Sequence, residues 1–160
     1  MPKTSLHRLI AIELDDSISN SLSAEAEHER RVAVHDLIED NSYQLCNGVN
    51  GPYRLKLSTH EGRLIFDTMN ETGQSVFVIG LGMSPFRKLV KDYYLICESY
   101  YDAIKLATPA QIETIDMARR GLHNEGSELL QERLAGKINF DFVTARRLFT
   151  LVSLLYWRGA

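Results

Sequence analysis

The chain has 160 residues, of which 44% are hydrophobic and 24% are charged, and these values are typical of one globular domain. Its net charge of −3 at pH 7 lacks the basic excess with which nucleic-acid-binding proteins neutralise phosphates, so a nucleic-acid partner is not expected. The longest uncharged apolar stretch near the C-terminus covers residues 148–157 and is too short to cross a bilayer, so no membrane partner is expected either.

Two cysteines, Cys46 and Cys97, provide neither a disulfide framework nor a zinc site. No metal site and no cofactor motif is predicted, and isolated thiols are typical of a reducing compartment. Residues 1–5 are expected to be flexible, and they lead into a strand without the apolar segment of a signal peptide. The sequence therefore predicts a cytoplasmic protein.

The first elements are a strand and a helix. Apolar and polar residues alternate from His7 to Leu14, which predicts a strand. Ser23 is a candidate N-cap for an amphipathic helix that ends at about Asp40.

The next segment shows the clearest strand pattern of the chain. Strands are predicted at residues 53–60, 63–69 and 74–81, joined by short turns at residues 61–62 and 70–73. A turn at Glu61-Gly62 places His60 opposite Arg63, and Lys56 opposite Asp67 as a cross-strand ion pair. The third strand is apolar on both faces, which predicts a central position or a subunit contact.

From Ser84 onward the apolar residues follow a helical period. Ser84 is expected to cap a helix with Pro85 in its first position, and residues of this helix form one stripe that is predicted to be buried: Phe86, Val90, Tyr93, Cys97, Tyr100 and Ile104. The pattern from Thr108 to Gln111 predicts a capping box at the start of another helix. Asp141 is predicted to cap a last helix from Phe142 to about Arg158.

These elements predict a single α+β domain over residues 1–160. An N-terminal strand and helix precede an antiparallel three-stranded meander, and three C-terminal helices are expected to pack on the sheet.

One candidate anion site is the junction between the third meander strand and the helix after it. Two glycines end the strand and basic residues begin the helix, so backbone N–H groups and positive charge would point at a bound anion. The residues of this candidate are Gly80, Gly82, Ser84, Arg87 and Lys88. The alternative is an ordinary glycine turn before a helix whose basic residues are solvated.

A second candidate lies on the helix that begins near Pro109. If that helix is continuous, Arg119 and His123 fall one turn apart within its apolar stripe, as does Arg133, and Glu125 flanks them. A buried Arg–His pair with a carboxylate could bind an anionic ligand or perform acid–base catalysis, so the candidate catalytic residues are Arg119, His123 and Glu125. Two alternatives remain open: a structural polar network, and a helix broken at Gly121 or Asn124.

A third polar surface is the hairpin face that carries Arg54, Lys56, Ser58 and His60. Its aromatic neighbour Tyr53 is predicted to face inward, so the aromatic platform of a nucleic-acid-binding sheet is missing. This face is interpreted as solvated surface.

Several segments together resemble a known family. They are residues 51–58, 84–93, 97–104, 115–126 and 144–150, which begin Gly-Pro-Tyr-Arg, Ser-Pro-Phe-Arg, Cys-Glu-Ser-Tyr, Ile-Asp-Met-Ala and Thr-Ala-Arg-Arg. The chain resembles the bacterial uncharacterised protein family number 0262 over nearly its whole length. The resemblance implies a stand-alone intracellular bacterial protein of this size and implies no activity.

Two classes of function are therefore open. The preferred one is a non-enzymatic binding or regulatory protein that forms a homodimer, because the last helix, Phe142 to Trp157, is apolar on more than one face. The other is a small enzyme or sensor for an anionic metabolite that carries phosphate or carboxylate, acting through Arg119, His123 and Glu125 and the helix start at Ser84.

Overall fold

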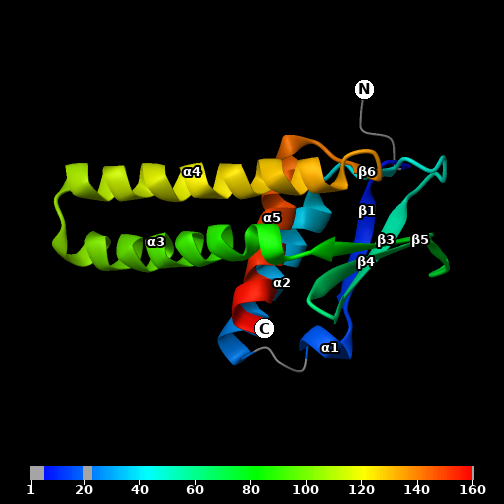
Figure 1. Cartoon of the computed structure of the whole chain (residues 1–160), viewed down its shortest axis with the longest axis horizontal. Coiled ribbons are helices and arrows are strands. Elements are labelled where there is room, and N and C mark those ends of the chain that lie inside the picture. Colours follow the sequence, from blue (N-terminus) through cyan, green and yellow to red (C-terminus); the bar gives the residue numbers. More distant parts are fainter. Residues whose placement is uncertain (1–5, 20–22, 160) are drawn as a thin grey trace.

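The computed structural model describes residues 6–19 and 23–159, with side chains as far as residue 156. Residues 1–5, expected from the sequence to be flexible, lie outside the described part. A four-stranded sheet and the helices packed against it form a body, and two long helices extend away from this body side by side (Figure 1). The elements are β1 (Leu9–Leu14), α1 (Asp16–Ser19), α2 (Ala24–Glu39), β2 (Gln44–Leu45), β3 (Tyr53–His60), β4 (Arg63–Met69), β5 (Ser75–Gly82), the 3-10 turn η1 (Ser84–Phe86), α3 (Arg87–Leu106), α4 (Pro109–Leu134), β6 (Ile138–Asn139) and α5 (Phe142–Gly159).

The large sheet has the order β1-β3-β4-β5. The predicted antiparallel meander is confirmed as β3, β4 and β5, while β1 adds to it in parallel with β3, so the sheet is mixed. The sequence prediction of a central third strand is wrong, because β5 is an edge strand and Val78 is 57% exposed. The alternative, a subunit contact through this strand, stays a prediction.

The β3–β4 hairpin has the predicted register. His60 lies opposite Arg63 and Lys56 opposite Asp67, and both turn residues, Glu61 and Gly62, have positive φ, as a two-residue type I′ turn requires. The predicted Lys56–Asp67 ion pair is replaced by other contacts. The Lys56 ammonium lies 3.6 Å from Asp15, and Asp67 accepts a hydrogen bond of 2.6 Å from the Ser75 hydroxyl.

Three helix starts follow the predicted chemistry. Ser23 accepts a hydrogen bond from the Ala26 amide, Thr108 and Gln111 form a reciprocal capping box, and Asp141 accepts from the Thr144 amide. The prediction for Ser84 is wrong, because this residue opens η1 and its side chain caps nothing. Phe86 precedes α3, which therefore begins without a side-chain cap.

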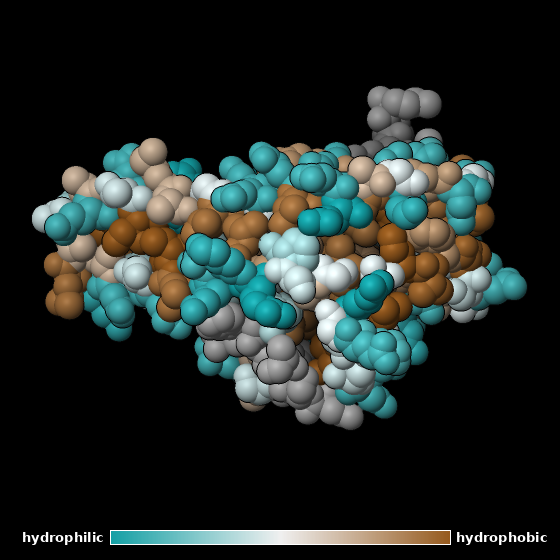
Figure 2. Space-filling view, viewed as in Figure 1, coloured by the Kyte–Doolittle hydropathy of each residue, from teal (hydrophilic) through white to brown (hydrophobic). Residues whose placement is uncertain are grey.

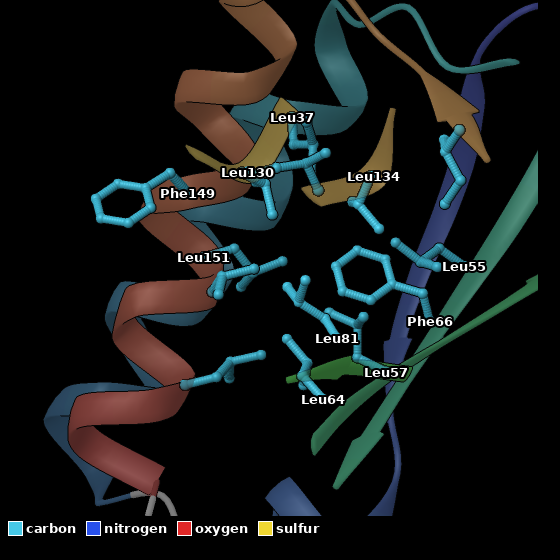
Figure 3. Packing of buried hydrophobic residues seen from close by; sticks show 14 of the residues in the cluster. Leu37, Leu55, Leu57, Leu64, Phe66, Leu81, Leu130, Leu134, Phe149 and Leu151 are labelled. Atoms are coloured by element: carbon cyan, nitrogen blue, oxygen red, sulfur yellow. The ribbon is translucent and has the colours of Figure 1, made fainter. Parts of the chain in front are cut away.

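The apolar residues of α5 are buried within the chain itself. Leu148, Phe149, Leu151, Val152 and Leu155 all belong to the hydrophobic core. In Figure 3, Leu151 lies on the side of α5 that faces the sheet, whereas Phe149 points away from the sheet. Phe142 and Val143, in the first turn, are exposed, and the side chain of Trp157 lies outside the described residues. The described apolar surplus of this helix thus needs no second chain to cover it.

Helices α3 and α4 form an antiparallel hairpin. The predicted buried stripe of α3 is buried only next to the body, at Phe86 and Val90, and Ile104 near the far end is 52% exposed. At the far end of this hairpin, α3 and α4 have only each other to pack against within the described part of the chain, as Figure 1 shows. Of the helices in the described part of the chain, none combines the length and apolar character needed to cross a membrane.

Candidate functional site

Helix α4 is continuous from Pro109 to Leu134. The alternative of a break at Gly121 or Asn124 is therefore wrong, and Arg119 and His123 lie one helical turn apart, as the unbroken pattern predicts. Both side chains are half-buried where α4 meets α3 and α5. The helix thus brings the two residues to one place beside the body.

A hollow of about 420 Å³ opens between α3, α4 and α5 at this place. Its lining combines Tyr93, Val143 and Thr150 with a group of basic residues, namely Arg119, Arg120, His123, Arg146 and Arg147. Among the described residues, no carboxylate lines it. The hollow is therefore an electropositive site built from two Arg-Arg pairs, one on α4 and one on α5.

The four guanidinium groups are unequally paired. Asp116 pairs with both arginines of α4: Arg119 donates to it at 2.5 and 3.2 Å, and the Nε atom of Arg120 lies 3.2 Å away. The hydrogen bond from Arg119 holds the pKa of the Asp116 carboxyl below its usual value. The Arg119 guanidinium also lies over the Tyr100 ring, 4.4 Å from its centre.

The arginines of α5 have weaker partners. Arg147 donates to the Asp40 carbonyl and lies 3.9 Å from its carboxylate. The exposed guanidinium of Arg146 makes no hydrogen bond or ion pair within the part of the chain that the structure describes. Four positive charges thus face two carboxylates, Asp116 and Asp40, and two positive charges remain uncompensated at the hollow.

His123 is held between aromatic rings and one hydroxyl. Its ring centre lies 5.4 Å from that of Tyr93 and 5.2 Å from that of Phe149, and its Nε2 atom lies 2.8 Å from the Thr150 hydroxyl. That hydroxyl donates to the Arg146 carbonyl, so we assign the proton of the neutral imidazole to Nε2. Nδ1 is buried and without a hydrogen-bond partner among the described residues.

Burial, with smaller contributions from Arg146 and Arg119, lowers the pKa of His123 to about 4. The imidazole is therefore neutral at pH 7, and the folded state binds fewer protons at this residue than the unfolded state between about pH 6.5 and pH 4. The contribution of His123 to stability is complete above this range and is lost as the pH falls through it.

We expect a His123→Gln variant to lose stability less steeply between pH 6.5 and pH 4 than the parent chain. Urea unfolding at a series of pH values measures this, and the exposed His28→Gln variant is the control. Equal pH dependence of the parent and the His123→Gln variant would contradict the lowered pKa.

The other residues of this candidate lie elsewhere. Glu125 is exposed, and its negative charge lies near Lys88. The pKa of Lys88 is raised mainly by its hydrogen bond to Asp92 and to a lesser extent by the charge of Glu125. Arg133 is exposed too, contrary to its predicted place in the stripe. Of the three candidate catalytic residues, the structure therefore brings together Arg119 and His123 but not Glu125.

The candidate anion site at the start of α3 does not join the hollow. Gly80 and Gly82 lie within β5, and Ser84 belongs to η1. The basic side chains are engaged elsewhere: the Nε group of Arg87 donates to the Tyr156 hydroxyl at 3.2 Å, and Lys88 pairs with Asp92 at 2.6 Å.

Sequence reasoning missed Arg120, Arg146, Arg147 and Thr150 as site residues. The visible signal was the repeated Arg-Arg dipeptide at positions 119–120 and 146–147, but nothing local indicates that the two helices meet there. It also missed a possible cation-binding group on α2, His35, Asp36 and Glu39, which the structure brings together on the exposed surface. Exposed groups of this kind are common without a bound ion.

The fold and the site define an α+β protein with a projecting helical hairpin and an arginine-lined hollow at its base. The sequence profile described as uncharacterised protein family UPF0262 matches residues 6–158, and the chain belongs to this family. It is 60% identical to a UPF0262 protein of Mesorhizobium japonicum over 95% of this chain and 94% of the relative. Relatives from Brucella anthropi, at 58% over 95% of both chains, and Xanthobacter autotrophicus, at 56% over 95% and 93%, are similar. No solved structure matches the chain.

Proposed function

We propose that this protein is a non-enzymatic cytoplasmic binding protein, and that its ligand is a small anion bearing phosphate or carboxylate groups, bound in the hollow between α3, α4 and α5. The observation that carries the proposal is the convergence of Arg119, Arg120, Arg146 and Arg147 on one hollow whose described lining contains no carboxylate. Planar guanidinium groups bind phosphate and carboxylate through paired, charge-assisted hydrogen bonds.

Arg146 supports the proposal most directly. Its charge is exposed and uncompensated within the described residues, whereas Asp116 already neutralises part of the charge on α4. An anion beside Arg146 would also lie close to the neutral His123, whose protonated form its negative charge would favour. The free thiols Cys46 and Cys97 fit a reducing cytoplasm.

Binding is favoured over catalysis by the chemistry of the lining. His123 is a weak base because its pKa is lowered to about 4, and burial raises the pKa of the Tyr93 hydroxyl so that it stays protonated. Glu125, the carboxylate that the enzyme alternative requires, is exposed and interacts electrostatically with Lys88 instead. The lining therefore offers positive charge and hydrogen-bond donors but no activated nucleophile or general base.

We expect inorganic phosphate, pyrophosphate or citrate at about 10 mM to raise the Tm of the parent chain above its value in potassium chloride of equal ionic strength. An anion at a hundred times its Kd stabilises the native state by about 2.7 kcal/mol, which corresponds to roughly 5–10 °C for a chain of this size. Replacing Arg146 by glutamine should weaken binding roughly tenfold or more, because it removes a charged donor.

The matched control is Arg133→Gln, which removes an exposed arginine of α4 that does not line the hollow. This variant should keep the full response to the anion. An anion bound near Arg146 should also raise the pKa of His123, which NMR of the imidazole reports, because the anion offsets the repulsion from the arginines. The proposal fails if no anion stabilises the parent chain, or if Arg146→Gln responds like Arg133→Gln.

A further inference from the structure

The projecting hairpin has almost no core of its own. We define the arm as residues 91–125, the part of α3 and α4 that extends from the body together with the turn between them (Figure 1). Within the arm, Ala103 is the single buried residue. Two packed helices of this length bury little surface between them, so the arm lacks the apolar burial that stabilises helices elsewhere in the chain.

Large apolar side chains of the arm face solvent instead. Figure 2 shows hydrophobic surface along the arm and at its far end. The exposed residues and their exposed fractions are Leu95 (46%), Tyr101 (65%), Ile104 (52%), Leu106 (92%) and Met117 (60%). Apolar residues gathered on one projecting element indicate a protein–protein contact, whereas single exposed apolar residues scattered over a surface do not.

The charge of the arm indicates what covers it. The outer half, residues 95–115, contains three acidic residues, Glu98, Asp102 and Glu113, and one basic residue, Lys105. The inner residues of the arm itself, 91–94 and 116–125, balance three basic with three acidic residues, but the arginine hollow beside them also carries the uncompensated Arg146 of α5. The acidic outer half of one copy is therefore complementary to the arginine hollow of a second copy that runs in the opposite direction.

We propose that two copies of this chain associate through their arms, packed in antiparallel orientation about a twofold axis. The two hairpins together form a four-helix bundle in which Tyr101 and Ile104, which lie one turn apart on α3, are covered by the second copy. The twofold axis places the acidic outer half of each arm beside the arginine hollow of the other copy and makes both contacts equivalent. The interface of the homodimer is thus the α3–α4 arm and not the last helix.

Light scattering and sedimentation equilibrium on the full chain test the proposal. At about 100 µM the parent chain should have twice the mass of the 18.2 kDa monomer. The double variant Tyr101→Glu with Ile104→Glu should be monomeric with unchanged circular dichroism, since both side chains are exposed within one chain. The matched control is Val78→Glu, which changes an equally exposed apolar residue on β5 and should leave the dimer intact.

The orientation is tested by the paired substitutions Glu98→Gln and Asp102→Asn, which remove acidic charge without changing shape. If the arms are antiparallel, these substitutions should raise the Kd of the dimer roughly tenfold. If the arms were parallel, the acidic residues of the parent chain would face each other, and removing their charge should lower the Kd. Three results would overturn the proposal: a monomeric parent chain, a dimer that survives the Tyr101/Ile104 changes, or dissociation by Val78→Glu, which would place the contact at the β5 edge.

The inference does not require anion binding, although a bound anion and the acidic outer half of the second copy would compete for the arginine hollow. Arg146→Gln tests the ligand response through Tm in added anion, while the Tyr101/Ile104 variant tests the mass in buffer without multivalent anions.

Discussion

Replacing Gly126 by alanine should destabilise the protein by about 2 kcal/mol, although alanine is the better helix former. Gly126 is buried on α4 where this helix crosses α5. A Cβ atom there would lie 2.7 Å from Cε2 of Phe149 and still closer to Cε1 and Cζ of the same ring. The glycine thus provides the space into which the Phe149 ring packs.

The Phe149 ring cannot move away without further cost. It is fully buried, and it contacts the rings of Tyr93 and His123 at centre distances of 6.0 and 5.2 Å. Displacing it would disturb the wall of the arginine hollow as well as the core. The cost of overpacking is therefore expected to exceed the gain of about 1 kcal/mol that alanine brings in helix propensity.

Gly121 provides the matched control on the same helix. A Cβ atom at this exposed position would meet no atom within 4 Å, so Gly121→Ala should stabilise the protein by about 0.5–1 kcal/mol. Urea unfolding of the two variants measures both effects. If Gly126→Ala proves as stable as the parent chain, the close packing of α4 against Phe149 is contradicted.

Replacing Asn41 by alanine should cost about 3 kcal/mol. The side chain is 4% exposed and lies where the end of α2 meets the start of β1. Its oxygen accepts from the Leu9 amide at 2.7 Å, and its amide group donates to the carbonyls of Leu9 and Leu37 at 3.1 and 2.9 Å. Three buried backbone groups would lose this partner together.

The comparison with Asn41→Asp separates hydrogen bonding from shape. Aspartate preserves the shape but turns two donated hydrogen bonds into repulsion between its oxygens and the two carbonyls, so it should be at least as destabilising as alanine. Exposed Asn139→Ala is the control, with an expected change within about 0.5 kcal/mol. Thermal unfolding tests this, and a Tm for Asn41→Ala within about 2 °C of the parent value would refute the bridging role.

Local signals predicted the elements that depend on local chemistry. The turn at Glu61-Gly62 determines the hairpin register, because two residues with positive φ join the strands in only one alignment. The caps at Ser23, Thr108 and Asp141 act within one helical turn of themselves, so neighbouring residues reveal them. The family, too, could be identified from short motifs along the chain.

Contacts between distant segments could not be predicted in this way. The parallel pairing of β1 with β3 and the edge position of β5 depend on the arrangement of the whole sheet, and alternation of residues is the same in every strand order. The strand pair β2 and β6 joins residues 44–45 to 138–139, and no local pattern indicates that pairing.

The same distinction between local signals and contacts of distant segments applies to the candidate site. The spacing of Arg119 and His123 was enough to predict that they share one face of a helix, because helical spacing is a local property. That Arg146 and Arg147 join them and that Glu125 does not follows from the packing of distant segments, because the crossing of α4 and α5 depends on how Gly126 and Phe149 pack. Helix α3 shows the same limit. Its period predicts an apolar stripe, but the stripe is buried only where the sheet and the other helices lie beside it, and the period does not reveal where that is.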